Sequence, residues 1–119
     1  MLACTDLPRS LAFYGDLLGG RETYRFPEEG EAAFIALAIG DSSEIGLGGI
    51  AAEPVHGRAQ RPTTGHRIEL CVYVEDVDGT YARAGASGFE TVADPQDMPW
   101  GERIAWIADP DGNLLMLTR

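Results

Sequence analysis

The segment DLPRSLAFYGDLLGG, residues 6–20, contains the element around which the fold is organised. Asp6 is a suitable helix N-cap, and Pro8 lies in the first turn, where a missing backbone N–H group is tolerated. The large apolar residues recur with the spacing of one helix face: Leu7, Leu11, Tyr14 and Leu18. The segment therefore predicts an amphipathic helix that starts after Asp6 and ends at Gly19-Gly20.

The same pattern returns 70 residues later. Asp76-Val77 corresponds to Asp6-Leu7 and opens a second helical stretch that closes at Gly88. The offset also aligns later positions without a gap, namely Phe34 with Ile104, Asp41 with Asp111, Ile45 with Leu115 and Leu47 with Leu117. Similarity at one fixed offset indicates two copies of one supersecondary unit.

Strand-like segments surround both helices. They cover residues 1–5, 21–26, 32–39 and 43–47 in the first half, and 68–74, 89–92, 103–108 and 114–118 in the second. Residues 109–113, DPDGN, have the composition of a tight turn, whereas residues 51–65 show no periodicity and predict a linker. We expect one α+β domain over residues 1–119, with βαβββ modules at 1–50 and 66–119.

Composition restricts the classes of function. The chain has 119 residues and a formal net charge of −10, which disfavours nucleic-acid and membrane-surface partners and favours a cationic small molecule. It has no apolar run of the roughly 20 residues that a membrane span needs, and no basic-then-apolar secretion signal. Cys4 and Cys71 lie far apart in strand-like stretches, so we expect reduced thiols and a cytoplasmic location.

The order and spacing of these motifs resemble the vicinal-oxygen-chelate superfamily, the glyoxalase and bleomycin-resistance group. The matching segments are residues 6–14 with Leu18-Gly19, residues 74–78 (VEDVD), residues 99–103 (PWGER) and residues 109–113. The resemblance covers nearly the whole chain and implies that each module forms a half-barrel, that two modules enclose a cavity, and that chains pair as homodimers. Because the group includes metal enzymes and metal-free drug-binding proteins, the fold alone does not set the function.

The resemblance also implies four metal-ligand positions on the first and last strands of the modules. They fall at Gly46, Glu69 and Met116, with the fourth upstream of Met1. Glycine has no donor atom and a thioether is a poor ligand for divalent ions, whereas a catalytic site needs about three protein ligands. His56 in the linker and His66, which has the opposite strand parity to Glu69, are weak substitutes. We therefore expect no metal cofactor.

Strand alternation places Glu69, Cys71 and Tyr73 on one face, which we expect to line the cavity. Glu69 could anchor a ligand cation or act as a general base. The alternatives are an ion pair with Arg67 or Arg103, or an exposed position at the rim. Met116 has the parity of the cavity side and would form a soft apolar wall, although methionine in a strand more often fills a core.

Aromatic residues supply further candidates. By the resemblance, Trp100 in the Pro-Trp-Gly loop could stack on a flat ligand, and anchoring of the loop is the alternative reading. Arg103 and Trp106 have opposite parity, and the pattern leaves open which of them faces the cavity. The first module adds weaker candidates: Phe34, Tyr24 and Glu44.

The favoured hypothesis is a binding protein that sequesters an aromatic or cationic small molecule, such as an antibiotic, without a metal. The first alternative is a lyase, isomerase or dioxygenase that either needs a metal or uses Glu69 as its base. The second is a degenerate module that fills its own cavity and acts in protein interaction. The absence of a Gly-x-Ser-x-Gly motif, and of Lys-Ser or Lys-Thr after the glycines at 46–49, argues against nucleophilic and phosphate-loop chemistry.

Overall fold

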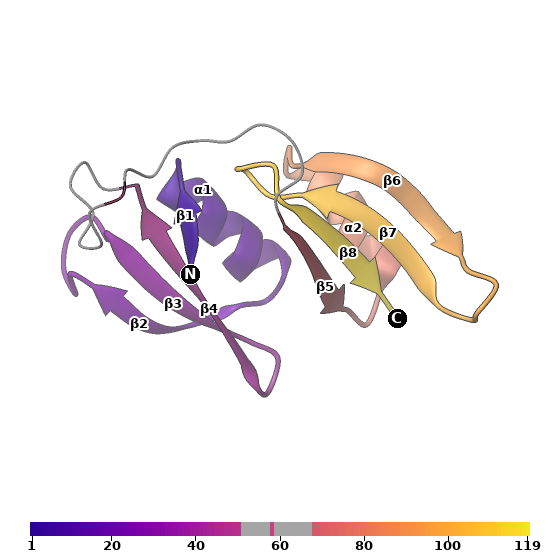
Figure 1. Cartoon of the computed structure of the whole chain (residues 1–119), viewed down its shortest axis with the longest axis horizontal. Coiled ribbons are helices and arrows are strands. Elements are labelled where there is room, and N and C mark those ends of the chain that lie inside the picture. The colour runs from indigo at the N-terminus through magenta and orange to yellow at the C-terminus, as the bar shows by residue number, and fades with distance from the viewer. Residues whose placement is uncertain (51–57, 59–67) are drawn as a thin grey trace. The chain divides into compact units, whose positions relative to one another are not determined.

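The computed structural model of the chain describes residues 1–50, 58 and 68–119. The chain divides into two compact units, Met1–Thr63 and Thr64–Arg119 (Figure 1). The elements of the first unit are β1 (Leu2–Cys4), α1 (Leu7–Leu11), the π-helix η1 (Ala12–Leu17), β2 (Arg21–Phe26), β3 (Phe34–Ile39) and β4 (Ser43–Gly49). Those of the second unit are β5 (Glu69–Tyr73), α2 (Val77–Ala86), β6 (Glu90–Asp97), β7 (Arg103–Ala108) and β8 (Leu114–Thr118). The expected α+β class, with two βαβββ modules, is confirmed.

Both units have the same sheet topology. The strand order is β1-β4-β3-β2 in the first sheet and β5-β8-β7-β6 in the second. In each sheet the first strand pairs in parallel with the last one, and the remaining pairs are antiparallel. Leu2 pairs with Leu47 and Val72 pairs with Leu117, so the 70-residue offset read from the sequence also holds for strand register.

The two helices begin in the same way. The Asp6 carboxylate accepts a hydrogen bond from the backbone N–H of Arg9 at 2.9 Å, and the Asp76 carboxylate accepts one from Gly79 at 2.9 Å. Each bond satisfies a backbone donor that has no partner inside the helix. The N-cap expected at Asp6 is therefore present, and Asp76 caps the second helix in the same way.

The expected buried face of the first helix is wrong at Leu11 and Leu18, which are only half-buried. The buried residues are instead Leu7, Ser10, Phe13, Tyr14 and Leu17. After Leu11 the helix continues as the π-helix η1, in which hydrogen bonds reach five residues along and each turn is wider than an α-helical turn. Positions 7, 10, 14 and 17 are three or four residues apart, so one helix face is still buried, but it is centred away from Leu11 and Leu18.

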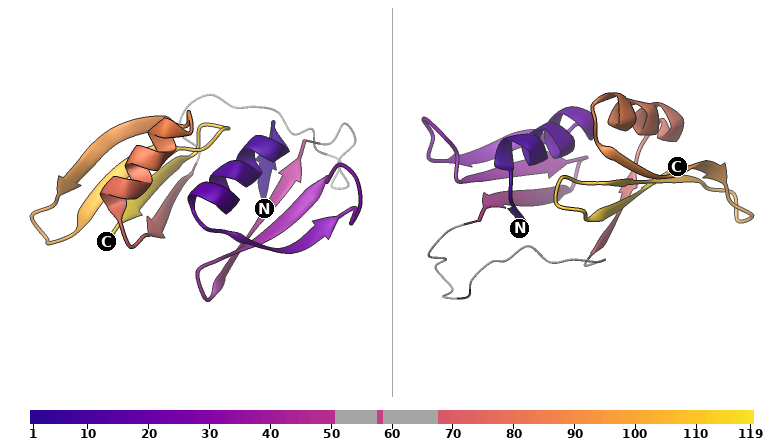
Figure 2. Two further views of the ribbon diagram at one scale, coloured as in Figure 1. Left: turned by 180° about the vertical axis from the view of Figure 1, so that it is seen from behind. Right: turned by 90° about the horizontal axis from the view of Figure 1, so that it is seen from above.

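Each helix covers one face of the sheet in its own unit, as Figure 2 shows from two directions. The cores lie between helix and sheet, with Phe13 packed edge-on against Tyr14 at a ring-centroid distance of 5.0 Å in the first unit. In the second unit, Ala84 of α2 and the inward residues of β7 and β8 are fully buried: Ala105, Ile107, Leu115 and Leu117. We call the opposite side of each sheet its open face, because among the described residues no helix of the same unit covers it.

Strand β6 is longer than the expected 89–92 and runs through Pro95 to Asp97. Its pairing with β7 shifts register twice, between Thr91 and Ala93 and again before Gln96. The expected linker at 51–65 lies outside the described residues apart from Arg58. In the part of the chain that the structure describes, each helix is too short or too polar to cross a membrane.

Candidate functional site

Three strands bring the main candidate residues onto the second open face. Cys71 of β5 pairs with Met116 of β8, which in turn pairs with Trp106 of β7, so these three residues form a row across the sheet. Glu69 and Tyr73 lie on the same face of β5, two residues to either side of Cys71. The expected common face of Glu69, Tyr73 and Met116 is therefore formed, and Trp106 lies on it as well.

The indole of Trp106 reaches across the sheet to Glu69. Its Nε1–H group donates a hydrogen bond to Oε1 of Glu69 at 2.9 Å. Strand β8 lies between the two parent strands, and neighbouring strands are about 4.8 Å apart, so the indole has to span β8 to make this bond. The second open face thus presents a fixed aromatic ring directly beside a carboxylate.

Arg103 lies on the opposite face, against α2. Its guanidinium donates through Nε and Nη2 to the carboxylate of Asp78 in α2, with the Nη2 bond at 2.6 Å, and through Nη1 to Asp97 at 2.9 Å. The hydrogen bonds to Asp78 and then Asp97 raise the pKa of Arg103, and the bond from Arg103 lowers the pKa of Asp78. Arg103 therefore ties α2 to the β6–β7 hairpin, and this placement separates it from Glu69 and the other ligand-binding candidates.

Trp100 lies in the loop between β6 and β7, where 67% of its surface is exposed. Its Nε1–H donates to Oε2 of Glu102 at 2.7 Å, and the loop is closed by a bond from Met98 N–H to the Glu102 carbonyl at 2.8 Å. The loop follows the end of the sheet where Tyr73 and Ile104 lie, whereas Glu69 is at the end near Ala108. The structure therefore does not bring Trp100 together with Glu69.

The first open face carries the remaining candidates. Phe34 lies over Gly46, since a Cβ atom built on Gly46 would be 2.9 Å from both Cε2 and Cζ of the ring. The ring of Tyr24 is next to that of Phe34, with centroids 6.2 Å apart and planes tilted by 53°. Glu44, which is two residues before Gly46 on the same face, accepts a hydrogen bond from Thr23 Oγ1 at 2.9 Å.

Three of the four implied ligand positions lie within this sequence, and the donor set of these three does not fit a divalent metal. Gly46 supplies no donor, and the Phe34 ring occupies the space in which a ligating side chain at this position would start. Met116 offers only a thioether, and Glu69 already accepts the indole N–H of Trp106. Within residues 1–50, 58 and 68–119, no three His, Cys, Asp or Glu side chains are grouped as a metal site requires. His56, His66 and Arg67 lie outside the described residues.

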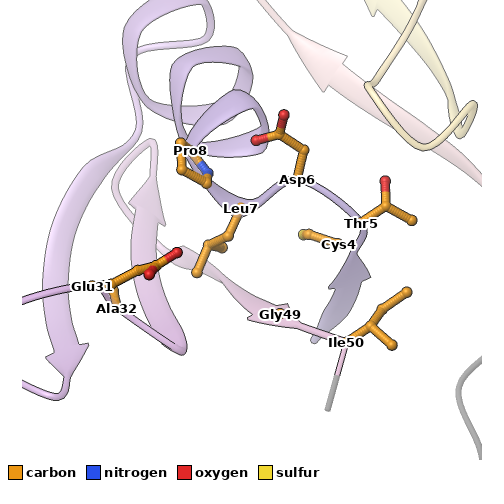
Figure 3. A pocket seen from close by; sticks show the side chains of 9 residues that line it. All are labelled: Cys4, Thr5, Asp6, Leu7, Pro8, Glu31, Ala32, Gly49 and Ile50. Carbon is orange, nitrogen blue, oxygen red and sulfur yellow. The ribbon is translucent and has the colours of Figure 1, made fainter. Parts of the chain in front are cut away.

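A separate hollow of about 580 Å³ opens at the start of α1 (Figure 3). It is lined by Cys4, Thr5, Asp6, Leu7, Pro8, Glu31, Ala32, Gly49 and Ile50. Its Asp6 carboxylate caps α1. None of the candidate ligand-binding residues lines this hollow.

The orientation of Trp106 toward the second open face is the feature that the sequence interpretation left undecided. The sequence feature that determines this orientation is the turn at 109–113. The turn sets Ala108 opposite Leu114 and therefore Trp106 opposite Met116. Once Met116 is placed on the open face, Trp106 must share that face and Arg103 must take the other one.

Comparisons with known proteins agree with this architecture. The model of the family described as Glyoxalase/Bleomycin resistance protein/Dioxygenase superfamily matches residues 1–117. CFP32 of Mycobacterium bovis, which carries the provisional name glyoxylase, is 31% identical over 116 residues, which are 97% of this chain and 41% of CFP32. The chain thus spans about two fifths of that relative's length.

Two solved structures are also similar to this chain. The crystal structure of TioX from Micromonospora sp. ML1 has a TM-score of 0.76 and 30% sequence identity, with coverage of 99% of this chain and 93% of TioX. The structure of a glyoxalase/bleomycin resistance protein/dioxygenase family enzyme from Burkholderia phytofirmans PsJN has a TM-score of 0.82 and 25% identity, with coverage of 98% and 92%.

Proposed function

This chain belongs to the glyoxalase/bleomycin resistance protein/dioxygenase superfamily, and from that membership and the second open face we propose that it binds a planar aromatic cation without a metal. The observation that carries this proposal is the hydrogen bond of 2.9 Å between Trp106 and Glu69. It places a large aromatic surface and a negative charge side by side, which is the combination that an aromatic cation needs.

The ring of Trp106 supplies the first part of the affinity. A flat ligand can stack on the indole, and a positive charge near the ring face gains about 0.5–2 kcal/mol from the quadrupole of the indole. The hydrogen bond to Glu69 fixes the ring, so little additional side-chain freedom is lost when the ligand binds. Met116, directly opposite Trp106, adds a flexible apolar contact that adapts to ligand shape.

Electrostatic attraction supplies the second part of the affinity. The carboxylate of Glu69 lies at the edge of the indole, where it can pair with the charged group of the ligand. The net charge of −10 on the whole chain attracts cations over longer distances and raises the rate of encounter. At the other end of the strand, Tyr73 is 76% exposed and can contact a ligand that extends along β5.

The hydrogen bond from Trp106 favours Glu69 as an anchor for a ligand cation rather than as a catalytic base. A general base has to take a proton from the substrate within hydrogen-bonding distance. The Oε1 atom of Glu69 accepts a hydrogen bond from the indole N–H. This bond fixes the orientation of the carboxylate, which suits a counter-ion for a bound cation. Chemical turnover of a ligand would favour the enzymatic alternative.

The experiment is a calorimetric titration of the full chain with proflavine, a planar aromatic cation, and with acridone, a neutral aromatic of similar shape. We expect proflavine to bind with the higher affinity. Glu69→Gln should weaken proflavine about tenfold, or ~1.4 kcal/mol, and leave acridone nearly unchanged.

The matched control is Glu75→Gln, which removes the same charge from an exposed residue outside β5. Equal effects of the two substitutions, or no proflavine binding at all, would contradict the proposal. Recovery of a chemically altered probe after incubation with the chain would support the enzymatic alternative instead.

A further inference from the structure

We propose that the outer edge of β2 is an interface at which two copies of this chain pair antiparallel, about a twofold axis between Thr23 and Tyr24. The proposal concerns assembly and does not depend on which ligand the second open face takes. It rests on the bulge in β2, which lies between Glu22 and Tyr24 and makes the strand complementary to itself in one register.

Strand β2 offers an unpaired edge. It is the last strand of the first sheet, in the order β1-β4-β3-β2, and its outer side pairs with no strand among the described residues (Figure 1). Such an edge presents backbone N–H and C=O groups to a further strand. Tyr24 and Phe26 are 54% and 57% exposed, although burial of large aromatic side chains is favourable. β2 contains no proline, whereas the corresponding edge strand β6 contains Pro95.

The bulge changes the alternation of side chains along β2. The residues on the first open face are Arg21, Thr23, Tyr24 and Phe26, and those on the helix-covered face are Glu22 and Arg25. The cross-strand partners of Glu22 and Arg25, which are Leu37 and Ile35, are buried beneath the helix. Thr23 is placed on the open face by the hydrogen bond that its Oγ1 donates to Glu44 at 2.9 Å. Two consecutive residues, Thr23 and Tyr24, therefore share one face.

This alternation selects one register for β2 against a second copy of itself. The selected register has Arg21 opposite Phe26, Glu22 opposite Arg25 and Thr23 opposite Tyr24, and the twofold axis repeats each pair. A shift of one or two residues in either direction sets an open-face residue opposite a helix-covered one. A shift of three residues keeps the faces matched, but it pairs only three residues and sets Glu22 opposite Glu22 or Arg25 opposite Arg25.

The charges in the selected register are complementary. Within one chain, Arg25 donates to Glu22 through Nε at 2.9 Å and through Nη2 at 3.1 Å. Its Nη1 group has no partner in the part of the chain that the structure describes. In the paired strands, Glu22 of each copy faces Arg25 of the other, so four charges alternate in sign around the axis. On the open face, the Arg21 guanidinium lies opposite the exposed ring of Phe26, as a cation–π contact requires.

The bulge also favours a second copy over a foreign strand. A regular strand alternates its faces at every residue, so it matches β2 on only one side of the bulge. A second copy has the same bulge at the axis, and its side chains therefore stay in phase on both sides. The net charge of −10 opposes association at long range, but β2 itself carries two arginines and one glutamate, so the edge that meets is not acidic.

The interface is small, because each copy contributes one strand of six residues. Stable interfaces bury roughly 800 Å² on each partner, so we expect a weak dimer that forms as the concentration of the chain rises. Sedimentation velocity of the full chain, at concentrations from about 10 μM to about 1 mM, measures this equilibrium.

Charge reversal tests the register. Glu22→Arg sets arginines opposite each other and Arg25→Glu sets glutamates opposite each other, so each variant alone should weaken the dimer at least about tenfold. An equimolar mixture of the two variants brings opposite charges together in the heterodimer. We expect association in the mixture to return to near that of the unmodified chain. Asp16→Arg, at an exposed position of η1, is the charge-matched control and should change the dimer less than about twofold.

Recovery on mixing separates a contact between copies from an effect within one chain. Each variant in the mixture still lacks its own pair between positions 22 and 25, so only a contact between copies can restore association. Three results would overturn the proposal: an unmodified chain that stays monomeric over the whole range, a dimer that neither reversal weakens, or a loss in both variants that mixing does not recover.

Discussion

Trp106 and Met116 lie directly opposite each other across β7 and β8, and the residues 70 positions earlier, Ala36 and Gly46, pair in the same way across β3 and β4. At this pair of positions the second unit has a tryptophan and a methionine, whereas the first unit has an alanine and a glycine. In the first unit, the ring that lies over Gly46 comes from Phe34, two residues before Ala36. The two repeats share a backbone plan and differ in the position that supplies the aromatic ring.

Replacing the two tryptophans separately tests which of them contacts the ligand. Trp106→Phe keeps an aromatic ring but removes the N–H donor to Glu69, so we expect proflavine affinity at the second open face to fall about fivefold, or ~1 kcal/mol. The variant should also lose most of the ligand-induced fluorescence quenching. Trp100→Phe, in the exposed loop, should keep both the affinity and the quenching. The opposite result in fluorescence titrations would place the ligand at the β6–β7 loop.

A double-mutant cycle tests the packing of Phe34 on Gly46. Gly46→Ala places a methyl group 2.9 Å from the ring, so we expect a loss of about 1 kcal/mol in the free energy of unfolding, measured with urea. In a Phe34→Ala background the penalty should disappear, because the ring is absent. Gly49→Ala in the same strand is the control, since its Cβ atom would meet only the Ala33 carbonyl at 3.8 Å. An equal loss in both backgrounds would disprove the contact.

The Arg103–Asp78 pair predicts an acid-dependent part of stability. Its hydrogen bond from Arg103 holds the pKa of Asp78 below the ordinary 3.8 in the folded chain. This stabilisation is therefore complete above that ordinary pKa and is lost as the pH falls through the lower folded value. Arg103→Gln should show a shallower decline in unfolding temperature below about pH 4 than the unmodified chain.

Two controls define the origin of that effect. Arg21→Gln, an exposed arginine on β2, should keep the original acid profile. Because Arg103 and Asp78 are both partly exposed, high salt should reduce the difference between Arg103→Gln and the unmodified chain. Identical acid profiles for all three proteins would show that the pair contributes nothing measurable.

Asp109 should be the most sensitive turn residue. It is only 6% exposed, and its carboxylate accepts hydrogen bonds from Asp111 N–H at 3.0 Å, Asn113 N–H at 2.8 Å and Asn113 Nδ2 at 2.8 Å. Asp109→Ala would leave the buried Asn113 donors without these acceptors, so we expect a loss of about 2–3 kcal/mol in urea unfolding. Asp41→Ala, in the exposed turn before β4, should cost less than about 0.5 kcal/mol.

Metal removal gives a further test of the donor set at Gly46, Glu69 and Met116. We expect dialysis against EDTA to leave proflavine affinity and the unfolding temperature unchanged, because these residues supply too few suitable donor atoms. Elemental analysis of protein purified without chelator should show no stoichiometric divalent metal. Loss of binding in EDTA, restored by zinc or manganese, would contradict this expectation.

Strand bounds could be predicted closely wherever turn residues border a short apolar run. The expected ranges 21–26, 103–108 and 114–118 coincide with β2, β7 and β8. A turn-forming residue borders each of these strands on at least one side: Gly20 and Pro27 flank β2, Asp109 follows β7, and Asn113 precedes β8. The repeat offset was also visible, because both helix caps and both sheets are built on it.

Packing that depends on other elements could not be read from local patterns. The buried face of the first helix includes Ser10 and Leu17 in place of Leu11 and Leu18, and a pattern of large apolar residues does not reveal a buried serine. The position of Phe34 over Gly46 likewise depends on which way a side chain turns across neighbouring strands. The orientation of Trp106, in contrast, followed from the turn at 109–113 and could have been derived.

The irregular backbone of the edge strand β6 affects how the second sheet can associate with other chains. Pro95 has no backbone N–H to offer, and the two register shifts distort the strand on either side of Ala93. An irregular border of this kind is a poor template for the addition of a foreign strand, and natural proteins use it against fibrous aggregation. The rim of the second sheet at β6 is thus closed to β-augmentation.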